Sequence, residues 1–186
     1  GFAYANYARP PVDTTLDEHV IITLVPAFYW PWTKTKRDGF RAQWQGWADT
    51  GARLFLRPNY TLSGHNMPIF YARKLAKDFS FASRNGLIGT DFDSLLGVWA
   101  NQGPNLYVLG RLHARPDLSA DQILDEYYAG FGPARDEVAA YFAHWEVLSD
   151  RITDAQYERY CEEEKGGSFK DWLRVVDRVF PQAAMG

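Results

Sequence analysis

The sequence predicts an α/β protein: the C-terminal part of a (β/α)8 TIM-like barrel, with about four parallel strands, followed by an all-helical tail. Short apolar runs recur along the first half, helical patterns separate the later runs, and only helical patterns follow Gly103. Alternating strands and helices are typical of a parallel sheet. A complete barrel takes about 250 residues, more than the 186 present. We therefore expect a partial barrel over residues 1–114 and a helical extension over 115–186. The alternative is an open four-stranded sheet with exposed edges.

Each of the four predicted strands ends in a polar or aromatic tip. Val20–Val25 is rich in β-branched residues, which is typical of a buried parallel strand. The other apolar runs are Phe2–Tyr7, Arg53–Arg57 and Leu87–Thr90. The carboxyl ends of parallel strands meet at one edge of a sheet, and β/α enzymes keep their chemistry there. Candidate functional residues are therefore sought at these tips.

Helices are predicted between the later strands. Asp38–Thr50 places Trp44 and Trp47 on one apolar face and stops before Gly51, a residue suited to follow a helix end. Asn66–Asn85 carries a second apolar face. The starts of the last three strands lie roughly 33 residues apart, which suits a unit of one strand and one crossover helix, whereas the first link is short and has no clear helix.

The tail is predicted from helix-start signals. Pro104 is expected to open a helix that runs to His113. Ser119–Gln122 and Thr153–Gln156 have the pattern of capping boxes. Ser168 is expected to cap a last helix.

The charge, the cysteine count and the absence of several motifs exclude some classes of function. The net charge is -3 and no basic run stands out, which argues against nucleic acid or an anionic membrane as the main partner. Cys161 is the single cysteine, which excludes an intrachain disulfide and a cysteine-based zinc site. The sequence lacks phosphate-loop, dinucleotide-binding and serine-hydrolase motifs. We expect no cofactor and no metal, since His19, His113 and His144 lack acidic or histidine partners at ligand spacing. No apolar run approaches the ~20 residues of a membrane span.

Asp91 and Asp93 are the candidate catalytic residues. They stand two residues apart after the fourth apolar run, so on a strand both side chains would point to one side. Same-face neighbours lie about 6.5 Å apart, and glycoside hydrolysis uses two carboxyl groups about 5–9.5 Å apart. They would act as acid and base, or bind sugar hydroxyls. Alternatively, one caps the following helix and the other pairs with an arginine.

Aromatic residues make up 16% of the chain, and several follow predicted strands. Tyr29, Trp30 and Trp32 follow the second strand, and the prolines among them rule out regular helix. Aromatic faces at the rim of a barrel are platforms for the C–H faces of a sugar ring. The alternative is that these rings pack in the core or against a neighbouring loop.

Further candidate substrate-binding residues follow the other strands. Asn6 lies near the end of the first strand, and Asn59 and Tyr60 hold the equivalent place after the third. His65 precedes a predicted helix and would bind a hydroxyl or a carboxylate. Trp99 precedes the Pro104 helix, where it would line the pocket or join the core.

Four segments resemble a glycosidase-like barrel family, domain of unknown function 4838. They are Ala-Tyr-Ala-Asn-Tyr-Ala-Arg-Pro-Pro, Gly-Thr-Asp-Phe-Asp-Ser-Leu, Trp-Ala-Asn-Gln-Gly-Pro-Asn-Leu-Tyr-Val-Leu and Asp-Gln-Ile-Leu-Asp-Glu-Tyr-Tyr-Ala-Gly-Phe-Gly-Pro-Ala. The likeness runs from about Phe2 to Glu146. The family is similar to α-glucuronidases and endo-β-N-acetylglucosaminidases. The resemblance implies strands five to eight of a barrel, a general acid supplied by the missing N-terminal half, and a secreted or periplasmic protein.

The sequence thus favours part of a glycoside hydrolase that acts on a complex glycan by carboxylate acid/base chemistry. The expected partners are an oligo- or polysaccharide and the missing half of the barrel, without which this chain would be inactive. The alternative is a non-catalytic carbohydrate-binding protein on the same scaffold.

Overall fold

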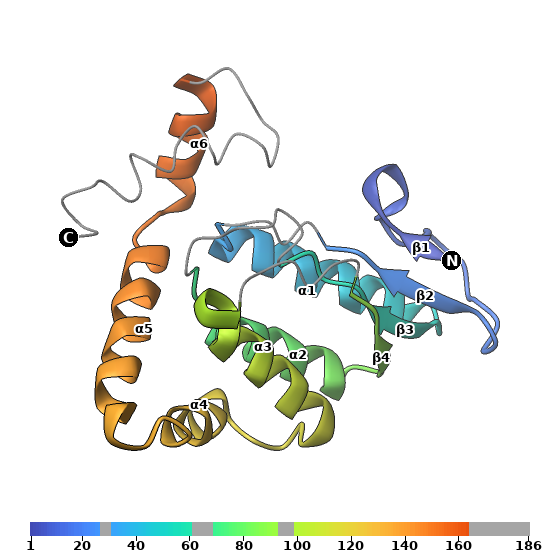
Figure 1. Ribbon diagram of the computed structural model, residues 1–186. Helices are drawn as coiled ribbons and strands as arrows, with labels where there is room; N and C mark the ends of the chain where they lie inside the picture. The colour runs from blue at the N-terminus through green and yellow to red at the C-terminus, as the bar shows by residue number, and fades with distance from the viewer. Residues whose placement is uncertain (27–30, 61–68, 93–98, 164–186) are drawn as a thin grey trace.

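The computed structural model describes residues 1–26, 31–60, 69–92 and 99–163. Its strands form one parallel sheet in the order β1-β2-β3-β4 (Figure 1). The strands are β1 (Phe2–Ala3), β2 (Ile21–Leu24), β3 (Arg53–Leu56) and β4 (Leu87–Thr90). The α-helices of the described part are α1 (Lys34–Asp49), α2 (Ala72–Arg84), α3 (Trp99–Ala114), α4 (Ala120–Ala129), α5 (Arg135–Asp150) and α6 (Asp154–Glu163). Parallel strands followed by helices confirm the predicted α/β class with a helical tail.

In the described part of the chain, one face of the sheet is buried and the other, which we call the open face, carries exposed side chains. Alternate residues of the central strands, such as Ile22, Leu24 and Leu54, pack against α1 and α2 in the first hydrophobic core. Residues in between point the other way, and Phe2 and Ile21 are exposed there. Since successive side chains of a strand alternate between faces, the burial pattern follows directly from the sequence.

Helix α1 begins four residues earlier than predicted. Thr33 is its N-cap, and the Thr33 side chain accepts a hydrogen bond from the backbone N–H of Lys36. Gly51, with φ of 84°, follows the helix end as expected. The predicted apolar face is confirmed, because Trp44 and Trp47 are buried.

Helix α2 separates two hydrophobic cores. Leu75 and Ala82 belong to the core under the sheet, whereas Ala76 and Phe79 belong to a second core with α3, α4 and α5. The helix begins at Ala72, later than the predicted start at Asn66. The tail helices therefore pack mainly on α2, while Leu109 of α3 and Leu148 of α5 also reach the core under the sheet.

Buried amides explain the late start of α2. The Asn105 carboxamide, on α3, accepts from the backbone N–H of Tyr71 at 2.9 Å and donates to the carbonyl of Ile69 at 2.8 Å. It also donates to the side-chain oxygen of Gln102. The turn before α2 thus has its backbone partners on another helix, which a local sequence pattern does not reveal.

Helix α3 begins at Trp99, so Pro104 lies inside it and does not open it. A proline at this position removes one helical hydrogen bond, since it has no N–H to donate. The capping boxes are confirmed: Ser119 and Gln122 exchange hydrogen bonds at 3.2 and 2.9 Å, and Thr153 and Gln156 at 3.2 and 3.0 Å. The helix predicted after Ser168 lies outside the described residues.

The first predicted strand is shorter than expected. Only Phe2–Ala3 is strand, and Ala5–Tyr7 forms a single turn of 3-10 helix, η1. Ala5 has φ of 47°, in the left-handed region, which ends the extended backbone. The turn is closed by the N–H of Tyr7 donating to the carbonyl of Tyr4 at 2.9 Å.

Candidate functional site

The carboxyl edge of the sheet is more regular than the strand bounds imply. The N–H groups of Val25, Arg57 and Asp91 donate to the carbonyls of Ala3, Leu24 and Leu56 at 3.0, 2.9 and 2.9 Å. The parallel ladder therefore continues for one residue past β2, β3 and β4. Since strand residues two apart share a face, the side chains of these three residues lie on the open face of the sheet.

Arg57 and Asp91 form an ion pair in this row. The guanidinium Nη1 of Arg57 lies 3.5 Å from Oδ2 of Asp91, whose side chain is 50% exposed. The guanidinium also lies over the ring of Phe2, 5.7 Å from its centroid. The Arg57 guanidinium thus lies between the partly exposed carboxylate of Asp91 and the exposed ring of Phe2.

Gly89, two residues before Asp91, lies on the same face of the sheet. A Cβ on Gly89 would lie 2.3 Å from the Phe55 ring. Glycine is therefore needed where the Phe55 ring crosses β4. This contact places Phe55 in the row of side chains below Arg57.

Several predicted site residues lie outside the described residues, namely Tyr29, Trp30, His65 and Asp93. Asn6 lies on the exposed turn η1, one residue after Ala5. Trp99 is 56% exposed at the start of α3, and its ring lies 6.4 Å from that of Tyr127 on α4. Asn59 is buried, and its Oδ1 has no hydrogen-bond partner among the described residues.

Trp32 and Tyr60 lie together but in the core. Each is 4% exposed, and the Tyr60 ring stacks on Tyr71 at 4.8 Å with an interplanar angle of 7°. The Trp32 ring contacts both, at 5.7 and 4.7 Å. Burial raises the pKa of Tyr71, and burial together with the nearby charge of Asp78 raises that of Tyr60. The two predicted platforms therefore turn their faces to other side chains, not to solvent.

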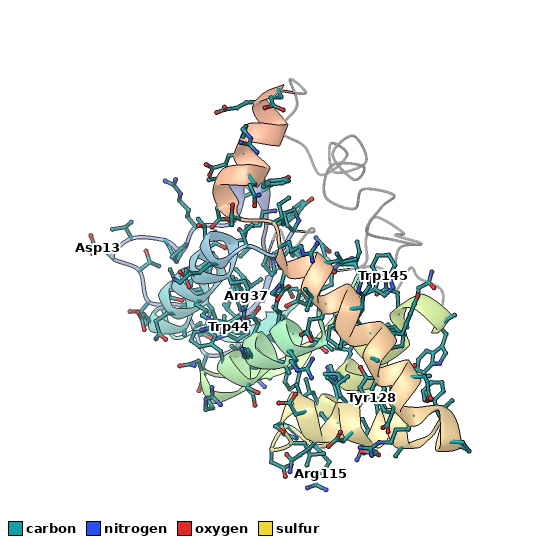
Figure 2. The ribbon with its side chains drawn as sticks, turned by 90° about the vertical axis from the view of Figure 1, so that its left-hand side faces the viewer. Asp13, Arg37, Trp44, Arg115, Tyr128 and Trp145 are labelled. Atoms are coloured by element: carbon teal, nitrogen blue, oxygen red, sulfur yellow. The ribbon has the colours of Figure 1, made fainter. Side chains whose placement is uncertain are left out.

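Beneath these rings lies an ionic network that sequence reasoning missed. Asp78 on α2 is 1% exposed and accepts hydrogen bonds from Arg37 at 2.9 and 3.0 Å and from Arg41 at 3.1 Å. The Tyr60 hydroxyl lies 3.5 Å from the same carboxylate. Figure 2 shows Arg37 and Trp44 on the side of α1 that meets α2. A sequence signal existed, since Asp78 interrupts the apolar stripe of α2.

Burial disfavours the charge on Arg37, yet its hydrogen bonds to Asp78 leave its pKa raised. The network joins α1, α2 and the segment after β3. We interpret it as a structural support for the carboxyl edge, because its carboxylate is fully enclosed.

Within the described ranges, no group of three or more histidine, cysteine, aspartate or glutamate side chains is placed to hold a metal ion. The same part of the chain contains no helix with the length and apolarity of a membrane span.

The fold and this edge define a class: a parallel β/α scaffold whose strand ends present a carboxylate, a guanidinium and aromatic side chains. Residues 1–144 match one protein family, described as Domain of unknown function (DUF4838), and the chain belongs to this family. Searches of curated proteins and of solved structures returned no match.

Proposed function

We propose that the carboxyl edge of the sheet binds a carbohydrate and that the chain is part of a glycoside hydrolase. The observation that carries the proposal is the Arg57–Asp91 pair, which stands on the open face beside the exposed ring of Phe2. A carboxylate accepts hydrogen bonds from sugar hydroxyls, a guanidinium donates them, and an aromatic ring covers the apolar face of a pyranose.

Hydrolysis of a glycosidic bond needs a second carboxyl group. Asp93 follows Asp91 by two residues and is the nearest candidate in the sequence. We propose Asp91 as a hydroxyl ligand or as one of the catalytic pair. The general acid would then come from another part of the barrel.

The open face of the sheet supports a partner for this chain. Sheets made only of parallel strands normally have both faces covered, whereas Phe2 and Ile21 are exposed on this one. We propose that the N-terminal half of a β/α barrel covers it. The family resemblance is our reason to place the protein in the periplasm or outside the cell.

A carbohydrate-binding protein without catalysis is the second candidate. It is favoured by the pairing of Asp91 with Arg57, because a carboxylate held by an arginine is suited to binding. On this reading, the exposed Trp99 would extend the binding surface.

The test compares glycan binding and glycan hydrolysis by the natural protein that contains this chain. Asp91→Asn and Asp93→Asn are measured beside Asp136→Asn, a matched change on the exposed surface of α5. If these acids catalyse, turnover falls about a hundredfold or more with binding retained. If they only bind, affinity falls in a protein that does not cleave. Unchanged binding and turnover in both variants would remove this edge from the proposal.

A further inference from the structure

A basic groove runs along α1 and α2, and it is lined by side chains other than those on the open face of the sheet. It consists of two cavities, of about 420 and 560 Å³, and the side chains of Arg41 and Lys77 line both. The first cavity reaches Asp150 at the end of α5, and the second reaches Ser119 at the start of α4. We call this feature the α1–α2 groove.

Helix α2 supplies one wall of the groove. Arg73, Lys77, Ser80 and Arg84 all line the second cavity, at spacings of three or four residues. Side chains at this spacing lie on one face of a helix. The stripe from Arg73 to Arg84 is about 16 Å long, at 1.5 Å per residue.

Acidic side chains neutralise part of this stripe and its surroundings. Arg73 pairs with Asp121 and Glu146, Lys74 with Asp150, and Lys34 with Asp38. The pairs of Arg73 and Lys74 join α2 to α4 and α5, and that of Lys34 lies within α1, so these side chains leave little positive charge for a ligand.

Three basic side chains of the groove are not balanced one for one by acidic side chains of the described residues. Lys77 and Arg84 are exposed and have no ion-pair partner among the described residues. Arg41 shares the single carboxylate of Asp78 with Arg37, and the Nε of Arg41 has no hydrogen-bond partner in the described part of the chain. This excess gathers in a chain whose net charge is -3.

We propose that the α1–α2 groove binds a ligand that carries a tetrahedral oxyanion, a phosphate or a sulfate group. Arg41, Lys77 and Arg84 supply the positive charge. The Ser80 hydroxyl, in the same cavity, adds a donor. Guanidinium groups match the oxygens of such anions with two parallel N–H donors, and lysine adds a point charge.

The start of α4 is not what carries this site. Its capping box already satisfies backbone N–H groups through Ser119 and Gln122, and Asp121 places a negative charge there. The proposal therefore rests on Lys77 and Arg84, on Arg41, whose charge Asp78 balances only in part, and on the cavity that all three line.

The groove is unlike a surface for single-stranded nucleic acid. Such surfaces place aromatic rings where bases stack. The aromatic side chain of the second cavity is Phe81, and the Arg41 guanidinium covers its ring at 5.3 Å from the centroid. An oxyanion on a small molecule or on a glycan fits this lining better.

Binding is measured by calorimetry on the whole chain at low salt, with four probes: inorganic phosphate, glucose 6-phosphate, a chondroitin sulfate oligosaccharide and polyuridylate. The variant Lys77→Gln/Arg84→Gln changes exposed side chains, so its fold is preserved. The control is Arg9→Gln/Arg135→Gln, which removes the same charge from exposed positions outside the groove.

We expect phosphate or sulfate probes to bind, with affinity lost by about tenfold or more in the groove variant and by less than about twofold in the control. Binding of inorganic phosphate alone would identify a site for the free ion. Tightest binding of glucose 6-phosphate would identify a sugar phosphate as the ligand, and tightest binding of chondroitin sulfate a sulfated glycan. Absence of binding by all anionic probes would overturn the proposal. So would an equal loss in the control, or tightest binding to polyuridylate. Each result is independent of glycan hydrolysis at the sheet edge.

Discussion

Replacing Asp78 by asparagine tests whether the buried network fastens α1 to α2. The carboxylate accepts three N–H hydrogen bonds of 2.9–3.1 Å from Arg37 and Arg41, and lies 3.5 Å from the Tyr60 hydroxyl. Asparagine keeps the shape but loses the charge and directs an amide N–H at donors. Removing one partner of a buried ion pair costs about 3–5 kcal/mol.

The lower end of that range applies here. The Arg41 side chain is 38% exposed, so water compensates part of its loss, whereas that of Arg37 is only 17% exposed. We expect the free energy of unfolding to fall by about 3 kcal/mol. In urea, with a slope of about 2 kcal/mol per molar, the midpoint would fall by about 1.5 M.

The neighbouring Asp38→Asn is the matched control, because Asp38 pairs with Lys34 in solvent on the same helix. It should cost less than about 0.5 kcal/mol. In Asp78→Asn/Arg37→Met, the losses should add to less than the sum of the single variants. A loss below about 1 kcal/mol for Asp78→Asn, or strict additivity, would refute the structural role assigned to this network.

Three further changes test other parts of the fold. Asn105→Leu should lower the free energy of unfolding by about 2–4 kcal/mol, because it leaves the N–H of Tyr71 and the carbonyl of Ile69 without their partner; wild-type stability in urea would contradict this. Tyr71→Phe should reduce the loss of stability in alkali. Burial raises the pKa of Tyr71 above 10, so its contribution is complete below pH 10 and is lost as the pH rises above it. The slope should ease by up to about 1.4 kcal/mol per pH unit, and identical alkaline unfolding curves would disprove the effect. Ser119→Ala should cost about 1 kcal/mol, because Ser119 shares a capping box with Gln122; an unchanged thermal midpoint would show that the box is dispensable.

Local patterns predicted the elements that depend on local physics. The β-branched run at β2, the apolar face of α1 and both capping boxes are confirmed, since alternation, helical spacing and side-chain caps act over a few residues. The starts of α2 and α3 differ from prediction. The turn before α2 is held by Asn105 from α3, and Pro104 is accommodated inside a helix. The sequence around each helix start does not reveal either feature.

In the candidate site, too, local features were predictable from the sequence and long-range contacts were not. The placement of Asp91 beside a strand end followed from its position after an apolar run, and its pairing with an arginine was one of the two readings of the sequence. That this arginine is Arg57 depends on the order of the strands, which places the ends of β3 and β4 side by side. The pairing of β3 with β4 therefore brings Arg57 and Asp91, which are far apart in the sequence, into contact.

The sequence did not distinguish the exposed aromatic residues from the buried ones. Trp32, Tyr60 and Trp99 all follow strands or begin helices, and nothing local separates a ring at a rim from a ring in a core. Tyr60 is buried because Tyr71 and Trp32 cover its faces and because its hydroxyl points to Asp78. Trp99 is 56% exposed although the ring of Tyr127 on α4 lies 6.4 Å from its own ring. An aromatic residue at a strand end thus remains a candidate sugar platform only when its ring stays largely exposed after neighbouring rings and buried hydrogen-bond partners have packed against it. Of the predicted platforms in the described part of the chain, Trp99 meets that condition.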